Sequence, residues 1–195
     1  MKIYLASRSP RRGELLRQIG VDFEVLPSDI DESALSCEAP EHYVLRLARE
    51  KALACVQILA RRGLPALPVL AADTTVCADG EILGKPENDA HATAMLRKMS
   101  GRWHSVHTGV AVALGDRVEV LLCSTQVEMK ILSETEIAAY IATGEPRDKA
   151  GAYGIQGLAG AFVSRIEGSF TGVMGLPVFE TAQILEKFGL TLFNN

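Results

Sequence analysis

Two arginines stand at the start of a predicted helix, where acidic residues are usual. The stretch YLASRSPRR, residues 4–12, predicts a short strand followed by a helix capped by Ser9 and opened by Pro10. The first turn of a helix has free N–H groups and a partial positive charge, so Asp or Glu is favoured there. This first turn instead carries Arg11 and Arg12. The helix start therefore needs an explanation for its two cations.

A phosphate bound at this turn would remove the conflict. The helix N–H groups, the hydroxyls of Ser7 and Ser9, and the guanidinium groups of Arg11 and Arg12 could all contact such an anion. The alternative is that both arginines lie on the solvated surface of the helix. The sequence has no Walker or dinucleotide-binding motif, so a site of this kind would be neither a P-loop nor a Rossmann site.

Another cation, Lys51, lies on the apolar face of a long helix predicted at 41–62. Apolar residues recur at helical spacing on this face: Val44, Leu47, Ala48, Ala52, Cys55 and Leu59. A charge that faces the core costs several kcal/mol unless it is paired. Lys51 therefore either snorkels from the edge of the face to solvent or pairs with an acid or a substrate phosphate in a cleft.

Asp73 follows an apolar run at 69–72, and we interpret it as a carboxylate at the end of a buried strand. Ligands gather outside the carboxyl ends of strands in open α/β sheets, so a catalytic role is one interpretation. A turn-forming or capping Asp is the other. Lys85 precedes Pro86 just after a hairpin turn at Asp79-Gly80, and it is either a site cation or an ordinary surface lysine.

A glycine-rich segment, DKAGAYGIQG at 148–157, holds few polar side chains apart from Asp148, Lys149 and Gln156. Small residues allow a ligand to approach the backbone closely, and a Gln amide can both donate to and accept from a base edge. A structural loop is the alternative. A zinc pair is not indicated, because His104 and His107 would point to opposite faces of a strand. No G-x-S-x-G elbow or Cys/His arrangement indicates an activated nucleophile.

Cations and a few carboxylates are thus the main chemical groups outside the core. The cations are Arg11, Arg12, Lys51, Lys85 and Lys149, and the carboxylates are Asp31, Glu32, Asp73 and Asp148. This mixture suits hydrolysis of a phosphoanhydride, in which cations hold the phosphates while carboxylates bind Mg²⁺ and orient water.

The elements that must position these residues alternate between strands and helices early in the chain. The pattern further predicts a strand at 23–26, a helix at 89–99, two long β-rich segments within 104–129 joined at Gly115-Asp116, a helix opened by a capping box at Ser133 and Glu136, a strand at 162–166 and a helix at 177–188. The predicted fold class is α/β with a mixed sheet.

Length and composition indicate a soluble, globular protein. The 195 residues could form one domain or two small lobes, and 48% of them are hydrophobic. A net charge of −4 gives no general affinity for nucleic acid or an acidic membrane. Four scattered cysteines without a C-x-x-C pair, and no signal or membrane-spanning segment, lead us to expect a cytoplasmic protein with reduced thiols.

The motifs together resemble one family, the Maf proteins, nucleoside triphosphate pyrophosphatases once described as septum-formation inhibitors. The shared segments are LASRSPRR, IDES, LAREKA, ADTTV, LGKP, DKAGAYGIQG and the later GLP at 175–177, in the family's order and spacing. The resemblance implies one Maf-like domain over 1–195, with a two-lobed fold like that of the inosine triphosphate pyrophosphatases and a cleft between the lobes. It also implies cleavage between the α and β phosphates.

The resemblance also implies roles for individual residues. Asp73 matches the family's proton acceptor, and the residues that match its phosphate and metal surroundings are Ser9, Arg12, Glu32, Lys51 and Lys85. The branch that acts on dTTP and UTP carries Arg, Thr and Gln at its specificity positions, here Arg11, Thr74 and Gln156. We expect a Mg²⁺ or Mn²⁺ ion held by Glu32 and Asp73, although which carboxylate acts as base is left open.

Two other functions are compatible with the same residues. The first is the function of the sister branch, which looks specific for 7-methyl-GTP and has Trp, Gln and Glu at the three specificity positions. This sequence agrees with the pyrimidine branch at all three positions. The second is a non-catalytic regulator of cell division that binds a nucleotide or a protein. The family likeness implies a homodimer. It does not rank dTTP, UTP and CTP as substrates, and it leaves open whether the protein removes unwanted nucleotides.

Overall fold

The chain folds into helices packed on strands of a mixed sheet, which confirms the predicted α/β class. The computed structural model describes residues 2–192. The strands are β1 (Lys2–Leu5), β2 (Asp22–Val25), β3 (Val69–Ala78), β4 (Glu81–Leu83), β5 (Trp103–Leu114), β6 (Arg117–Met129) and β7 (Val163–Glu167). The helices are α1 (Pro10–Gln18), α2 (Pro40–Arg62), α3 (Asp89–Met99), α4 (Glu134–Ala142), α5 (Phe170–Met174) and α6 (Val178–Glu186), with short 3₁₀ helices η1 (Glu145–Asp148), η2 (Ala150–Ala152) and η3 (Leu158–Phe162).

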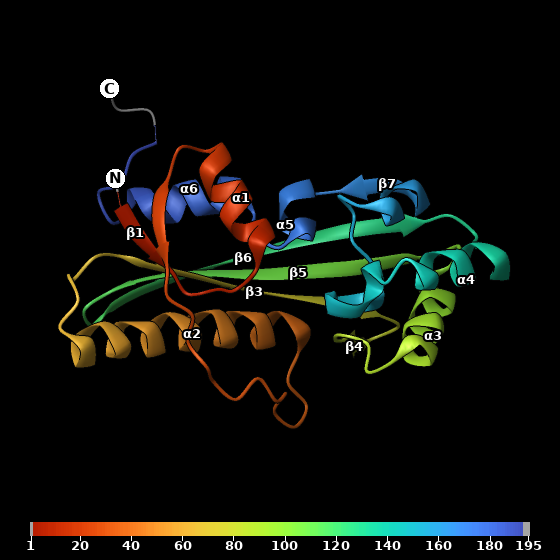
Figure 1. Cartoon of the computed structure of the whole chain (residues 1–195), viewed down its shortest axis with the longest axis horizontal. Coiled ribbons are helices and arrows are strands. Elements are labelled where there is room, and N and C mark those ends of the chain that lie inside the picture. Colours follow the sequence, from red (N-terminus) through yellow and green to blue (C-terminus); the bar gives the residue numbers. More distant parts are fainter. Residues whose placement is uncertain (1, 193–195) are drawn as a thin grey trace. The chain divides into compact units, whose positions relative to one another are not determined.

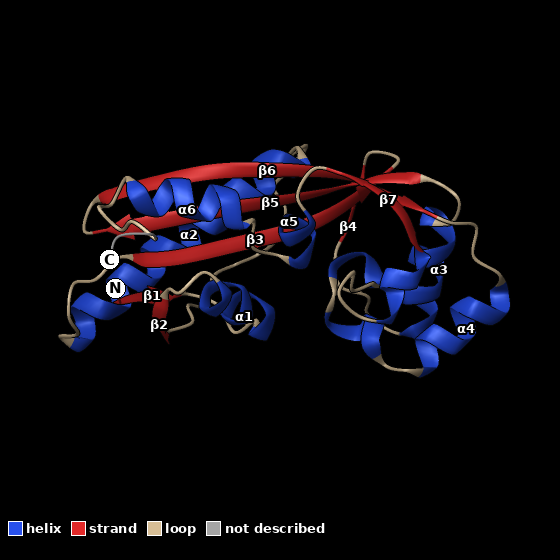
Figure 2. Ribbon diagram, turned by 90° about the horizontal axis from the view of Figure 1, so that it is seen from above, coloured by secondary structure: helices blue, strands red, loops and turns tan. Residues whose placement is uncertain are grey.

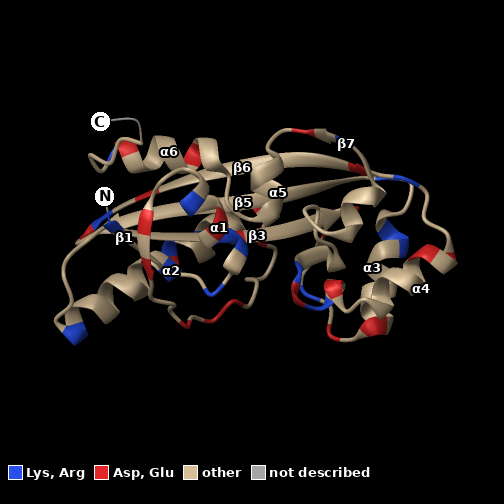
Figure 3. Cartoon of the chain, turned by 45° about the horizontal axis from the view of Figure 1, so that its top comes forward, with Lys and Arg blue, Asp and Glu red and all other residues tan. Residues whose placement is uncertain are grey.

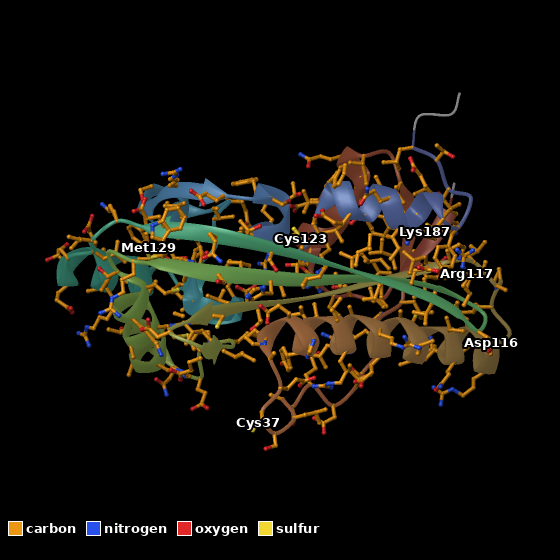
Figure 4. The ribbon with its side chains drawn as sticks, turned by 180° about the vertical axis from the view of Figure 1, so that it is seen from behind. Cys37, Asp116, Arg117, Cys123, Met129 and Lys187 are labelled. Carbon is orange, nitrogen blue, oxygen red and sulfur yellow. The ribbon has the colours of Figure 1, made fainter. Side chains whose placement is uncertain are left out.

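The sheet has the strand order β2-β1-β3-β5-β6-β7, and β4 pairs with β3. β1 runs parallel to β2 and to β3, whereas the β3–β4 and β6–β7 pairs are antiparallel. Two residues join β5 to β6, so these strands form a hairpin whose turn is marked by Asp116 and Arg117 in Figure 4. The predicted mixed sheet is confirmed.

The described chain divides into two compact units. The first takes in the chain up to Asp73, then Thr108–Cys123, and then the chain from Gly175 onward. The second comprises Thr74–His107 and Ser124–Met174. Strands β3, β5 and β6 contribute residues to both units.

In the first unit, helix α2 covers one face of the strands, while α1 and α6 lie on the other (Figure 1). Small residues of α2, Ala48, Ala52 and Cys55, are fully buried against the strands. The approach of α2 to β5 is very close, because a Cβ on Gly109 would lie 2.4 Å from the carbonyl oxygen of Val44. This close packing brings polar side chains of α2 within reach of the strands.

In the second unit, α3 and α4 pack together and enclose an apolar core with the short 3₁₀ helices (Figure 2). The predicted capping box opens α4, since the Ser133 hydroxyl accepts from the Glu136 N–H and the Glu136 carboxylate accepts from the Ser133 N–H. The glycine-rich segment at 148–157 begins at the last residue of η1, contains η2 and ends just before η3. Helix α5 was not predicted, because five residues are too few for a helical period to appear.

Candidate active site

Asp73 lies in the middle of a strand, not at its end. Strand β3 continues from Val69 to Ala78, so the prediction of a strand-end carboxylate is wrong. The β-branched residues after Asp73 and the apolar Val76 carry the strand onward, because such residues pack well on a pleated surface. The carboxylate is only 7% exposed, which means that a charged group is held inside the first unit.

Lys51 of α2 is the partner of this carboxylate. Its Nζ lies 2.7 Å from Asp73 Oδ1 and 2.9 Å from Glu32 Oε1, and the residue is 8% exposed. Of the two interpretations of Lys51, pairing with an acid is the one that the structure shows, and the snorkelling alternative is wrong. One ammonium therefore joins α2, β3 and the loop between β2 and α2.

Burial and charge act on Asp73 in opposite directions. Burial raises the pKa of the Asp73 carboxyl, while the positive charges of Lys51 and Arg12 oppose that rise. Burial likewise lowers the pKa of the Arg12 guanidinium, and the charges of Asp73 and Glu32 oppose that decrease. These four side chains thus belong to one electrostatic cluster within the first unit.

Arg12 is fixed by the turn after β1 and by the chain just before α6. Its Nη1 donates to the Ser7 hydroxyl at 3.1 Å, and its Nε donates to the carbonyl of Gly175 at 2.8 Å. Ser7 Oγ also accepts from the N–H of Ser9, which has the extended backbone of an N-cap but forms no side-chain cap. The predicted helix start is confirmed, with Pro10 as its first residue.

The loop that carries Glu32 is acidic (Figure 3) and is tied to α2 at several points. Arg46 donates to both carboxylate oxygens of Glu38, at 2.6 and 2.7 Å, and to the carbonyl of Ser33 at 3.0 Å. The hydroxyl of Tyr43 donates to the carbonyl of Glu32 itself. We call the Arg46–Glu38 pair the loop latch, because it fixes the segment that delivers Glu32 to Lys51.

Arg11 is half-buried on α1 of the first unit, and the remaining predicted site residues lie in the second unit. Thr74 is half-buried on β3, while Lys85 and Gln156 are exposed. Lys149 is engaged internally, since its Nζ donates to Asp148 Oδ1 and to the carbonyl of Glu145. The roles of Thr74, Lys85 and Gln156 stay predictions.

Several groups with structural roles near these residues were not predicted. The Arg46–Glu50 pair on α2, 3.3 Å apart, has the i,i+4 spacing of a helical ion pair, whereas the loop latch to Glu38 has no such spacing. His104 was considered only as a metal ligand, but its Nε2 lies 2.8 Å from the hydroxyl of Tyr153, and burial lowers its pKa to about 4. No local pattern links residues 49 positions apart.

The first unit therefore presents a buried lysine, two carboxylates and an arginine in one charged cluster. The chain belongs to the Maf-like protein family, whose model matches residues 2–188. No described helix is long and apolar enough to span a bilayer.

Curated relatives cover almost the whole chain. A protein of Methylobacillus flagellatus named dTTP/UTP pyrophosphatase is 65% identical over 98% of this chain and 94% of its own length. A Chromobacterium violaceum protein of the same name is 56% identical over 98% of this chain and 96% of its own length. A Haemophilus ducreyi protein named nucleoside triphosphate pyrophosphatase is 51% identical over 97% of this chain and 96% of its own length. Among solved structures, the Staphylococcus aureus Ham1 protein is similar over 66% of this chain and 72% of its own, with 16% identity and a TM-score of 0.43.

The loop latch predicts a pH-dependent contribution to stability. The hydrogen bonds from Arg46 lower the pKa of the Glu38 carboxyl to about 2, below its value in the unfolded chain, about 4.3. The latch therefore stabilises the fold fully above the unfolded value, and this contribution is lost as the pH falls toward 2. In urea unfolding, Arg46→Met should be less stable than the wild type at pH 7, and the difference should shrink at pH 3.

Arg97→Met is the matched control, because Arg97 forms the same two-bonded pair with Glu134 on the exposed surface. Exposed pairs contribute little, so this variant should lose less stability at pH 7. A stability difference for Arg46→Met that is equal at pH 7 and pH 3, or larger at pH 3, would contradict the assignment.

Proposed function

We propose that this protein is a nucleoside triphosphate pyrophosphatase that hydrolyses dTTP and UTP between the α and β phosphates. The products are the nucleoside monophosphate and pyrophosphate. The observation that carries the proposal is the buried Lys51–Asp73 pair beside Glu32 and Arg12, in a chain of the Maf-like family. The names of the relatives at 51–65% identity support the same substrates and reaction.

Asp73 is the general base of the proposed mechanism. Lys51 contacts its Oδ1, which leaves Oδ2 to accept a proton from water. The water oxygen attacks the α phosphorus, the bond from that phosphorus to the bridging oxygen breaks, and pyrophosphate leaves with the bond electrons. Burial favours this role, because a carboxylate with a raised pKa is a stronger base.

The cations stabilise the negative charge that moves onto pyrophosphate. Arg12 is held by Ser7 and Gly175 before substrate arrives, so little reorganisation is needed during the reaction. Ser9 and Arg11 belong to the same helix start and contact the phosphates in this proposal. Lys85 contributes a further positive charge in this proposal.

A divalent cation fits the carboxylates of the first unit. Mg²⁺ and Mn²⁺ prefer oxygen ligands, and Mg²⁺ is usually bound by one or two carboxylates together with substrate phosphates and water. Among the described residues no group of three or more His, Cys, Asp or Glu side chains could hold a metal. Glu32 and Asp73 would therefore hold the ion jointly with the substrate, and the ion would neutralise phosphate charge. Glu32 is better suited to direct ligation, because its side chain is 55% exposed.

The proposal assigns base recognition to Arg11, Thr74 and Gln156. The Gln156 amide both donates and accepts, which matches the neighbouring N–H and carbonyl groups of uracil and thymine. The two units act in this proposal as one functional domain over 1–195. The proposal extends to a homodimer in the cytoplasm that binds neither nucleic acid nor membrane, and the net charge of −4 supports the lack of nucleic-acid binding.

Asp73→Asn tests the base directly. The variant keeps the shape of the side chain but cannot accept the proton, so kcat for pyrophosphate release from dTTP should fall by about 10²–10⁴-fold. Asp116→Asn, in the exposed β5–β6 turn, is the matched control and should keep wild-type kcat. A folded Asp73→Asn enzyme with a near-normal kcat would show that Asp73 is not the base.

Substrate choice and metal dependence are tested on the wild type. Pyrophosphate release is measured with dTTP, UTP, CTP and 7-methyl-GTP, each with Mg²⁺ or Mn²⁺. We expect the highest kcat/KM for dTTP and UTP, and complete loss of release when EDTA removes the cation. A preference for 7-methyl-GTP would assign the protein to the sister activity, and no release from any nucleotide would support a non-catalytic regulator.

A further inference from the structure

The segment that carries Gln156 is held in a tight turn of the second unit. The N–H of Gly157 donates to the carbonyl of Gly154 at 3.0 Å, which closes a four-residue turn with Gln156 as its third residue. Gln156 is exposed, whereas the three residues before Gln156 are buried. The turn therefore presents the Gln156 side chain outward from a fixed base.

Two side chains from outside the turn bind its backbone on both sides of Gln156. The hydroxyl of Tyr140, at the end of α4, accepts from the N–H of Gly154 at 3.2 Å. The carboxylate of Glu145 accepts from the N–H of Leu158 at 3.0 Å. Tyr140 also donates its hydroxyl proton to Glu145 Oε1 at 2.9 Å, so the two residues form one continuous chain of hydrogen bonds.

The glycines of the turn leave room for this arrangement. A Cβ on Gly157 would lie 2.4 Å from Glu145 Oε1, and a Cβ on Gly154 would lie 2.7 Å from Cε of Lys149. Lys149 in turn donates to the carbonyl of Glu145 at 2.7 Å. A Cβ at either glycine would therefore displace the carboxylate of Glu145 or the end of the Lys149 side chain from its place beside the turn.

The Tyr140 hydroxyl is buried and protonated, so it can donate. Tyr140 is 3% exposed, and burial raises the pKa of its hydroxyl, as does the hydrogen bond to Glu145. The phenol therefore stays protonated at neutral pH and donates to the carboxylate while accepting from Gly154. Tyr153, which precedes Gly154, is also fixed, because its hydroxyl contacts the Nε2 of His104.

We infer that Tyr140 and Glu145 are positioning residues that set the base specificity of the enzyme by holding the backbone around Gln156. The inference rests on the proposed function, in which Gln156 reads the pyrimidine edge. Discrimination between bases needs the amide to be held to within about 0.5 Å of its hydrogen-bonding position. The hydrogen bonds to Gly154 and Leu158 provide that restraint without contact between Tyr140 or Glu145 and the substrate.

The test compares Tyr140→Phe and Glu145→Gln with the wild type. The readout is the ratio of kcat/KM for dTTP to that for dGTP, a purine nucleotide with the same triphosphate. Each variant should lower this ratio by roughly ten-fold, the effect of about one net hydrogen bond. The loss should appear mainly as a higher KM for dTTP, because the cations and the base of the first unit are unchanged.

Glu136→Gln is the matched control. Glu136 lies on the same helix and accepts from the N–H and hydroxyl of Ser133 and from Lys130, but it does not bind the turn. This variant should change stability and leave the specificity ratio at the wild-type value. The double variant Tyr140→Phe/Glu145→Gln should lose no more than the larger single loss, because both residues act through one chain of hydrogen bonds.

Amide hydrogen exchange separates this inference from the proposed function. Exchange at Gly154 and Leu158 should be faster in Tyr140→Phe and Glu145→Gln than in the wild type and in Glu136→Gln. Folded variants with wild-type exchange and a wild-type specificity ratio would overturn the inference. Faster exchange with an unchanged ratio would overturn the role in specificity, and a wild type that cleaves no nucleotide would defeat the proposed function.

Discussion

A single ammonium group between two carboxylates is the interaction on which the first unit depends. Lys51 reaches Asp73 on the central part of β3 and Glu32 on a loop, so it links three segments that are far apart in the chain. Removing one partner of a buried ion pair leaves the other charge uncompensated, at a cost of about 3–5 kcal/mol. The same arrangement places a carboxylate beside cations in a buried position and shifts its pKa, as is common at catalytic sites.

The backbone of the first unit is shaped to permit this pairing. Small residues on the buried face of α2 and the glycine at position 109 bring the helix very close to the strands. A larger side chain at these positions would move Lys51 away from Asp73, because interiors are close-packed and transmit such shifts. The loop latch completes the arrangement, because it ties the segment that carries Glu32 to Arg46 of α2.

Much of this could be predicted from the sequence, and the failures have physical causes. Helical spacing placed Lys51 on the buried face correctly, because the period of 3.6 residues is a local property. Its partner could not be derived from spacing, since Asp73 lies 22 residues away and is brought near by tertiary packing. Asp73 was assigned to a strand end because the change from apolar to polar residues suggested a boundary, whereas the β-branched residues beyond it continue the strand.

The glycine-rich motif shows the same limit. Its small residues indicated close approach to something, but the sequence did not say to what. In the structure the neighbours are Glu145 and Lys149 of the same unit. Both the loop latch and the Tyr140–Glu145 pair are made of residues that act on backbone segments, and such residues have no signature in the spacing of catalytic groups. The sequence therefore predicts the groups that carry chemistry better than those that position them.

A crystal structure of the protein with α,β-imido-dUTP, which cannot be cleaved between those phosphates, tests the central claim most directly. The account predicts that the α phosphorus lies next to the Asp73 carboxylate, and that phosphate oxygens contact Lys51 or Arg12. A triphosphate bound elsewhere, with Lys51 and Asp73 paired and remote from it, would contradict the account.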